Sequence, residues 1–323
     1  MTWSRRMTMA LGLAGAAAPV LARTVPARAL RERFILPDGI PTEGPPPAIT
    51  APRSSFRLPD GGTLTYWDTG GDKPVVLLLH AATGSDRSWA YQVPALARAG
   101  YRVISFSRRG AAGSSPAPVG QPQSAEEDLE RFIDGLGLRR LHLVGTAAGG
   151  IYALRYALKH PDRLRSLTIS CSLGALSDPE LVTMTRALLP PSFGKLPPEL
   201  KELSPSYRAA NPAGVKLWLD IEAANHSGAE AVTTKSDGAA PVPIAPPGPP
   251  GPRLADLDRL TMPVHYVYGD ADLYAPPPLG RILAGATRRG ELTVIAEAGH
   301  SAHWEQPRVF NRELLAFWAR RRA

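Results

Sequence analysis

Short apolar runs alternate with segments of helical periodicity along most of this chain, and this alternation constrains the fold more than any other feature. Runs of this length that alternate with helices are typical of parallel strands buried on both faces. The sequence therefore predicts an α/β protein with a mostly parallel sheet and helices on both faces. The expected strands are residues 75–79, 101–106, 141–145, 167–171, 264–268 and 292–295, and the expected helices are residues 89–99, 124–133, 151–159, 179–189, 214–224 and 307–320.

Proline-rich stretches divide the chain into parts. Residues 30–52 are aperiodic and rich in proline, so we expect a linker or an extended arm there. Residues 173–253 interrupt the strand rhythm with helix-like pieces and a proline tract, which cannot form a helix or a central strand. We expect this insertion to be a helical and Pro-rich lid on a core made of residues 53–172 and 254–323. A hairpin is expected around Asp60-Gly61-Gly62.

The first 29 residues have the pattern of an export signal. Arg5-Arg6 precedes a short apolar stretch that resembles the core of a twin-arginine signal. That stretch is too short to span a bilayer, and no later segment has an uninterrupted apolar run of sufficient length. We therefore expect an exported, periplasmic protein without a stable membrane span; the alternative is a cytoplasmic protein with an amphipathic or disordered tail.

Charge and cysteine content exclude several classes of function. The formal net charge is +8, but four arginines of residues 1–29 contribute to it, and the rest is scattered without a basic run. Nucleic-acid binding is therefore not expected. A single cysteine excludes a disulfide framework and a zinc site built on two or more cysteines. We expect a small-molecule substrate and neither cofactor nor metal, while the oligomeric state is left open.

Polar and glycine-rich segments follow the ends of the expected strands. The carboxyl ends of parallel strands meet at one edge of an open α/β sheet, where ligands bind. Side chains from these segments are therefore expected to lie close together. The segments are residues 80–85, 107–114, 145–150, 269–272 and 299–307.

In these segments the chain resembles the α/β-hydrolase superfamily, of the single-domain, lid-containing esterase or haloperoxidase type. The resemblance implies the α/β-hydrolase fold and the chain order nucleophile, acid, histidine. It places Ala147 at the nucleophile position, Asp272 at the acid and His300 at the base. It also places the backbone N–H groups of Ala148 and Ala82 in an oxyanion hole.

The chain departs from this family at the nucleophile. The family pattern is G-x-S-x-G, whereas residues 145–149 are Gly-Thr-Ala-Ala-Gly, and a methyl group cannot attack a carbonyl. One explanation is a serine hydrolase inactivated by a single Ser→Ala change. The other is natural divergence, which the further departures at Ala81, Ser107 and Ala112 favour.

Other residues of the expected cleft have two interpretations each. His80 and Ala81 lie on the oxyanion loop, and His80 either braces that loop or transfers protons. Arg109 either structures its turn or binds an anionic group of a substrate. Cys171 is either a small buried hydrophobic residue or a displaced nucleophile.

These residues predict an enzyme in which His300, oriented by Asp272, acts as a general base without a serine nucleophile. The expected reaction is hydrolysis of a small, partly apolar ester or carbonyl compound without an acyl-enzyme, or a lyase step. The alternative is a ligand-binding pseudoenzyme that kept the fold and lost catalysis.

Overall fold

The protein is described here from a computed structural model, which describes residues 30–37, 44–116, 125–226 and 251–320. The expected export signal and most of the proline tract of the insertion lie outside the described residues. The strands are β1 (Arg31–Ile35), β2 (Arg53–Arg57), β3 (Thr63–Asp68), β4 (Val75–Leu79), β5 (Arg102–Phe106), β6 (Leu141–Thr146), β7 (Leu164–Ser170), β8 (Val264–Gly269) and β9 (Gly290–Ile295). The helices are α1 (Gln92–Arg98), α2 (Ala125–Gly135), α3 (Ala148–Lys159), α4 (Pro179–Leu188), α5 (Pro198–Glu202), α6 (Pro205–Ala210), α7 (Pro212–His226), α8 (Pro277–Ala286), α9 (Ala302–Glu305) and α10 (Pro307–Ala319).

The strands within the described ranges form one sheet in the order β1-β9-β8-β7-β6-β4-β5-β3-β2. Pairing is parallel from β1 through β5, whereas β2 and β3 add an antiparallel hairpin at one edge. The predicted mostly parallel sheet is confirmed. The central strands β4 and β6 are almost entirely buried because their apolar side chains face helices on both sides.

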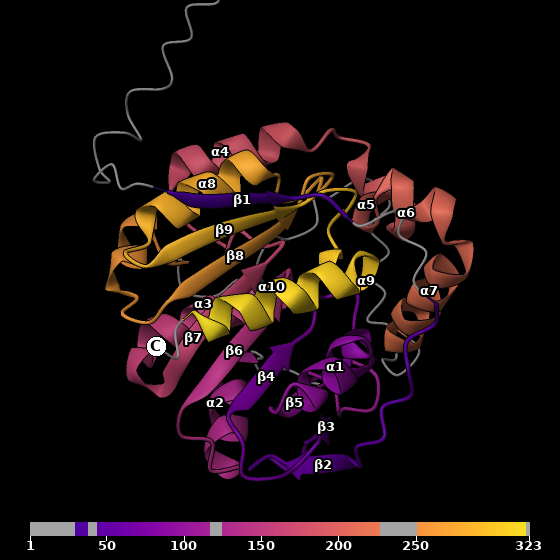
Figure 1. The fold of residues 1–323 in the computed structure, drawn as a ribbon, viewed down its shortest axis with the longest axis vertical. Coiled ribbons are helices and arrows are strands. Elements are labelled where there is room, and N and C mark those ends of the chain that lie inside the picture. Colours follow the sequence, from indigo (N-terminus) through magenta and orange to yellow (C-terminus); the bar gives the residue numbers. More distant parts are fainter. Residues whose placement is uncertain (1–29, 38–43, 117–124, 227–250, 321–323) are drawn as a thin grey trace, which may run out of the picture.

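Helices cover both faces of this sheet, as the sequence predicts (Figure 1). A larger apolar core joins one face of the sheet to α2, α3 and α8, with Phe132 and Leu154 among its buried side chains. A second core joins the other face to α1 and α10, with Trp89 and Phe317 fully buried. Two apolar layers of this kind hold the strand ends rigidly, which is what a site built on the connecting loops needs.

Part of the expected N-terminal arm is a strand of the sheet. The expectation of a linker or arm over residues 30–52 is corrected at β1, which pairs in parallel with β9 at the sheet edge. The apolar pattern did not indicate a strand because its residues are mostly exposed. Charged contacts hold it instead: Arg33 contacts Glu313 of α10 at 2.6 Å, and Glu32 contacts Arg281 of α8 at 2.7 Å.

The described part of the insertion consists mainly of helices α4 to α7. Figure 1 shows α5, α6 and α7 beyond the carboxyl ends of the central strands. Each of these helices begins with a proline, which is favourable in the first turn because that position needs no N–H donor. A third apolar cluster, with Tyr207 and Trp218 from the insertion and Trp304 from α9, joins these helices to the core.

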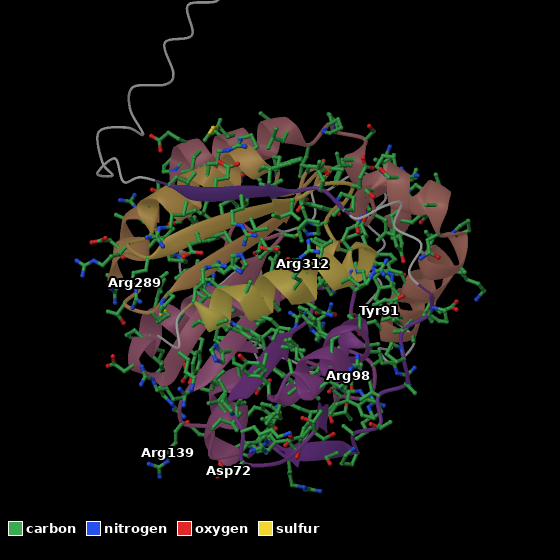
Figure 2. All side chains as sticks on the ribbon, in the orientation of Figure 1. Asp72, Tyr91, Arg98, Arg139, Arg289 and Arg312 are labelled. Carbon is green, nitrogen blue, oxygen red and sulfur yellow. The ribbon has the colours of Figure 1, made fainter. Side chains whose placement is uncertain are left out.

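The surface positive charge is spread over the molecule. Figure 2 shows Arg98, Arg139 and Arg289 on well-separated parts of the surface, and all three are exposed. These three arginines therefore do not form one basic patch. Among the described residues, no helix is both long enough and apolar enough to cross a membrane.

Candidate active site

The turn from β6 into α3, called the elbow below, keeps a strained backbone although it carries no serine. Ala147 lies at its apex with φ 49° and ψ −116°, a conformation that residues with a side chain rarely adopt. Gly145 and Gly149 allow the close approach, because a Cβ on Gly149 would clash with the Leu79 carbonyl oxygen and one on Gly145 with the Gly149 backbone. The backbone therefore presents the Ala147 side chain in the manner expected of a nucleophile.

The strained φ of Ala147 predicts that a glycine there stabilises the protein. Ala147→Gly should raise the free energy of unfolding by about 1 kcal/mol, because relief of a strained φ of about 1–3 kcal/mol outweighs the entropic cost of glycine. Ala148→Gly is the matched control, and it should lower stability because Ala148 already has helical geometry. Urea unfolding of both variants checks this. Equal destabilisation by the two changes would show that the elbow is not strained.

Asp272 and His300 are in direct contact. They lie on the loops that follow β8 and β9, and His300 Nδ1 is 2.8 Å from Asp272 Oδ1 and 3.0 Å from Oδ2. The backbone N–H groups of Tyr274 and Ala275 also donate to Asp272 Oδ1, so the carboxylate is held from two sides. Both side chains are buried. Because Nδ1 faces Asp272, Nε2 is the nitrogen left to exchange a proton.

A carboxyl group of the insertion lies beside this dyad. Glu202, at the end of α5, is 7% exposed, and its Oε2 atom has no hydrogen-bond partner among the described residues. Its backbone carbonyl accepts the Ser301 N–H at 3.2 Å, so α5 packs directly on the loop after β9 that carries His300, called the base loop below. Tyr274 completes the group: its hydroxyl contacts the Glu202 side chain, and its ring centroid is 4.4 Å from that of His300.

The charges of Asp272 and Glu202 determine the protonation of His300. Burial alone would lower the pKa of His300, but the charges of Asp272 and Glu202 outweigh burial and raise that pKa to about 9. Burial raises the pKa of the Glu202 carboxyl, and the His300 charge opposes this shift. At neutral pH the raised pKa of His300 therefore favours the imidazolium over the neutral ring that can accept a proton.

Glu305 fixes the loop that carries His300. Its Oε1 accepts the N–H groups of Gly299 at 2.9 Å and Ser301 at 3.2 Å, while Oε2 accepts the Ser204 N–H at 2.7 Å. Burial raises the pKa of Glu305 to about 7 in spite of these hydrogen bonds. One fully buried carboxyl group thus ties the base loop to the insertion.

The oxyanion loop is braced by His80. Its Nε2 accepts the backbone N–H of Arg108 at 3.0 Å, so the ring proton is on Nδ1, which donates to the Ala81 carbonyl oxygen at 2.6 Å. Burial lowers the pKa of His80 well below its usual range, which keeps the ring neutral. Ala82, the residue after Ala81, is exposed. The N–H of Ala148 has no intrahelical partner, because Ala148 is the first residue of α3.

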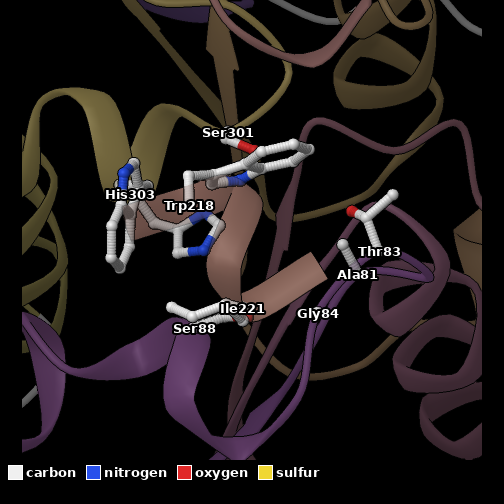
Figure 3. A pocket seen from close by; sticks show the side chains of 9 residues that line it. Ala81, Thr83, Gly84, Ser88, Trp218, Ile221, Ser301 and His303 are labelled. Carbon is white, nitrogen blue, oxygen red and sulfur yellow. The ribbon is translucent and has the colours of Figure 1, made fainter. Parts of the chain in front are cut away.

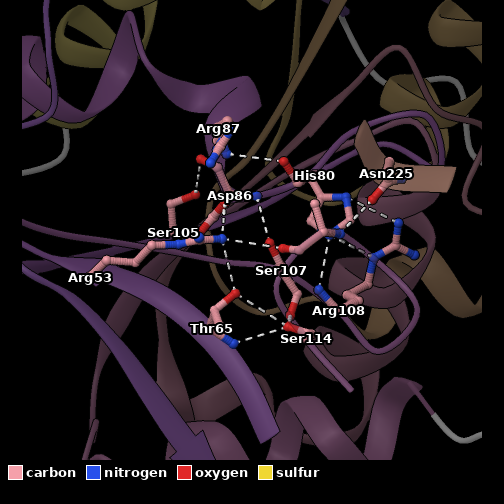
Figure 4. A network of polar contacts seen from close by, with 12 residues as sticks. Arg53, Thr65, His80, Asp86, Arg87, Ser105, Ser107, Arg108, Ser114 and Asn225 are labelled. Carbon is pink, nitrogen blue, oxygen red and sulfur yellow. Dashed lines mark hydrogen bonds and ion pairs between the residues drawn. The ribbon is translucent and has the colours of Figure 1, made fainter. Parts of the chain in front are cut away.

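A polar network connects this loop to its surroundings (Figure 4). The side chain of Asn225, in α7, donates to the Ala82 carbonyl oxygen at 3.1 Å and accepts the Ala112 N–H at 2.9 Å. Ser107, where the family usually has Asp, accepts the Asp86 N–H at 3.0 Å. The insertion therefore contacts both halves of the site: Glu202 at the base loop and Asn225 at the oxyanion loop.

Two residues singled out from the sequence have environments that disfavour their chemical interpretations. Arg109 forms ion pairs with Asp60 at 2.5 Å and Asp128 at 2.7 Å, so its charge is neutralised within the turn. Cys171 is fully buried after β7, and burial raises the pKa of its thiol well above the usual value. A thiol of this kind stays protonated and unreactive at neutral pH.

A small cavity lies between the oxyanion loop and α7 (Figure 3). Its volume is about 10 Å³, the size of a single water molecule, and its lining includes Ala81, Trp218, Ser301 and His303. It adjoins the site but is too small for an ester. Among the described residues, no cluster of His, Cys, Asp and Glu side chains is placed to hold a metal ion.

Sequence patterns gave no signal for Glu202, Tyr274 or Asn225. Each acts through a contact between the insertion and a core loop, and neither Glu202 nor Asn225 belongs to a motif. The proline-initiated helix of Glu202 was itself not predicted. A Glu at the end of a short helix, followed by the N-cap Ser204, is a pattern too common to identify a site.

Comparisons with known proteins agree with this architecture. The family model described as alpha/beta hydrolase fold matches residues 74–217. The 2-hydroxy-6-oxononadienedioate/2-hydroxy-6-oxononatrienedioate hydrolase of Escherichia coli (strain K12 / DH10B) is 26% identical over 280 residues, which cover 80% of this chain and 91% of that protein. The corresponding hydrolase of Paraburkholderia phymatum is 29% identical, with 80% and 92% covered.

Solved structures show the same fold. A thermophilic esterase from Thermogutta terrifontis superposes with a TM-score of 0.67 at 24% identity, covering 84% of this chain and all of that one. The enol-lactonase of Burkholderia xenovorans LB400 superposes with a TM-score of 0.60 at 22% identity, covering 80% and 98%. With its mostly parallel sheet and its elbow between β6 and α3, the chain has the α/β-hydrolase fold and is similar to hydrolases of that superfamily.

Proposed function

We propose that the protein is a hydrolase of a small, partly apolar ester or carbonyl compound, in which His300 activates water directly. The observation that carries the proposal is the buried His300–Asp272 contact at 2.8 Å in a protein whose elbow has no nucleophile. The relatives support a carbonyl substrate, because two of them are hydrolases named for 6-oxo compounds. The apolar side chains of the insertion support a partly apolar one.

In this mechanism the neutral imidazole accepts a proton from water at Nε2 while its Nδ1–H donates to Asp272. The water oxygen forms a bond to the carbonyl carbon, and the N–H groups of Ala82 and Ala148 donate to the resulting oxyanion. The tetrahedral intermediate then collapses, and the leaving alkoxide takes the proton back from His300. The products are an acid and an alcohol, and no bond to the protein forms at any step. Abstraction of a proton from the substrate by the same base would give a lyase step instead.

The pH dependence of turnover follows from the raised pKa of His300. The neutral ring is the active base, so kcat/KM should rise with pH and level off above about pH 9. Glu202→Gln should move this inflection to lower pH and make the variant several-fold faster than the wild type at pH 7. Profiles of both proteins between pH 5 and 10 measure this. An unmoved inflection would contradict the role of Glu202, and Glu199→Gln, on the same helix, is the control.

A screen of esters, thioesters and β-dicarbonyl compounds at pH 9, with parallel labelling by a fluorophosphonate, tests the proposed function. Turnover without covalent labelling supports it, because a fluorophosphonate needs an activated nucleophile. Turnover with labelling would contradict the mechanism, and mass spectrometry after thiol alkylation would show whether Cys171 is the labelled residue.

A ligand-binding pseudoenzyme is the second candidate. The combination of Ala147 with a base that is mostly protonated at neutral pH favours it. It predicts no turnover of any compound in the screen at any pH, while a small apolar ligand still raises the melting temperature. Such a result would replace the hydrolase proposal.

A further inference from the structure

Arg108 places a guanidinium beside the oxyanion loop. It is the second residue after β5, and its Nη2 donates to the Ala81 carbonyl oxygen at 2.9 Å. On its other side the Cζ atom lies 4.9 Å from the ring centroid of Tyr152, which belongs to α3. The guanidinium therefore lies between the two elements that carry the N–H groups of Ala82 and Ala148, and Figure 4 shows it against the His80 ring.

The contacts of this guanidinium within the described ranges are all neutral. They are the Ala81 carbonyl, the His80 ring and Tyr152, and none is a carboxylate. Burial lowers the pKa of Arg108 from its usual value, whereas its neighbour Arg109 has two acidic partners, Asp60 and Asp128. A desolvated charge without a counterion is costly, so proteins generally pair such charges.

We propose that Arg108 binds a carboxylate group of the substrate, next to the carbonyl that reacts in the oxyanion hole. A guanidinium offers five N–H donors in a planar fork, and that fork matches a carboxylate in two parallel hydrogen bonds. One guanidinium balances one negative charge, which fits a carboxylate better than a doubly charged phosphate. The reactive part of this inference rests on the proposed hydrolase function, whereas the binding of the carboxylate does not.

Stability of the free protein distinguishes the two neighbouring arginines. Arg108→Gln should leave the melting temperature unchanged or raise it, since it removes a half-buried, partly desolvated charge that has no counterion among the described residues. Arg109→Gln should lower it clearly, because buried Asp128 then keeps only the longer contact with Arg131 at 3.7 Å. If Arg108→Gln destabilises the protein as much as Arg109→Gln, Arg108 is already neutralised within the chain and the proposal is wrong.

Equilibrium binding of two probes gives the direct test. Monomethyl succinate carries one ester and one carboxylate, and dimethyl succinate carries the same ester without the charge. Titration calorimetry should show that the wild type prefers the monoester by about 10- to 100-fold. Arg108→Gln should lose this preference, while Arg87→Gln, which removes an exposed positive charge near the same loop, should keep it.

The same titration in a His300→Ala background separates this inference from the proposed function. The His300→Ala variant could still prefer the monoester while the wild type shows no turnover. That combination would support the carboxylate site and contradict the proposed hydrolase function. The carboxylate site would be overturned if the wild type bound both probes with equal affinity. It would also be overturned if Arg108→Gln preferred the monoester as strongly as the wild type does. Both conclusions hold whatever the turnover.

Discussion

Ala147→Ser should increase the turnover of p-nitrophenyl butyrate by about 10³-fold or more and make the protein react with a fluorophosphonate. Loss of the serine costs about 10⁶ in turnover in a serine protease of another fold, and the reverse change restores part of this when the other components are in place. Here the strained elbow and the His300–Asp272 contact are both present without the hydroxyl. The assay belongs at pH 9, because the raised pKa of His300 leaves more of the neutral base there than at pH 7.

Ala148→Ser is the control for this prediction. It adds the same hydroxyl one residue later, within α3 and away from the apex of the elbow. The account expects no gain from it. If Ala147→Ser gains nothing either, the chain has diverged beyond a missing hydroxyl, and a serine hydrolase inactivated by one substitution is excluded. A large gain would show that the groups around Ala147 still support catalysis by a serine. It would agree both with a single Ser→Ala change and with natural divergence.

The fold was predictable because its signal is local. The run at residues 75–79 is apolar throughout, and it forms the buried strand β4 with the same bounds. The strand β1 was not predictable in this way. Its residues are mostly charged and exposed, and its position depends on Glu313 and Arg281, which lie about 250 residues or more away in the sequence.

The site was predictable where it depends on strand ends. Asp272 and His300 follow neighbouring parallel strands, so their contact follows from the topology of the sheet. Glu202 and Asn225 lie in the insertion, and their contacts depend on how α5 and α7 pack against the core. Hydrophobic periodicity carries no information on that packing.

Arg108 and Arg109 also show that the local sequence does not reveal tertiary contacts. Sequence reasoning considered Arg109 for an anionic substrate, but the hairpin and α2 supply it with Asp60 and Asp128. Arg108 has no acidic partner in the described part of the chain, and we infer that it is the residue with a free charge. The tertiary packing determines which of two adjacent arginines forms ion pairs with acidic residues.

His300→Gln should lower kcat/KM for the best ester of the screen by about 10²- to 10⁴-fold, the usual contribution of a general base. Glutamine keeps a polar side chain of similar size in the buried position, so the fold should survive, and circular dichroism verifies this. The Asp272 carboxylate alone cannot replace the imidazole, because it is held by the N–H groups of Tyr274 and Ala275. His160→Gln is the matched control, since His160 lies beyond the far end of α3 from the elbow.

The central claim is that His300 is the base of a site without a nucleophile, and kcat/KM at pH 9 for the wild type, His300→Gln and His160→Gln tests it most directly. The account predicts turnover by the wild type and His160→Gln and a loss of at least about 100-fold in His300→Gln. Equal turnover by all three proteins would contradict it, because the reaction would then proceed without the only proton acceptor that the mechanism assigns.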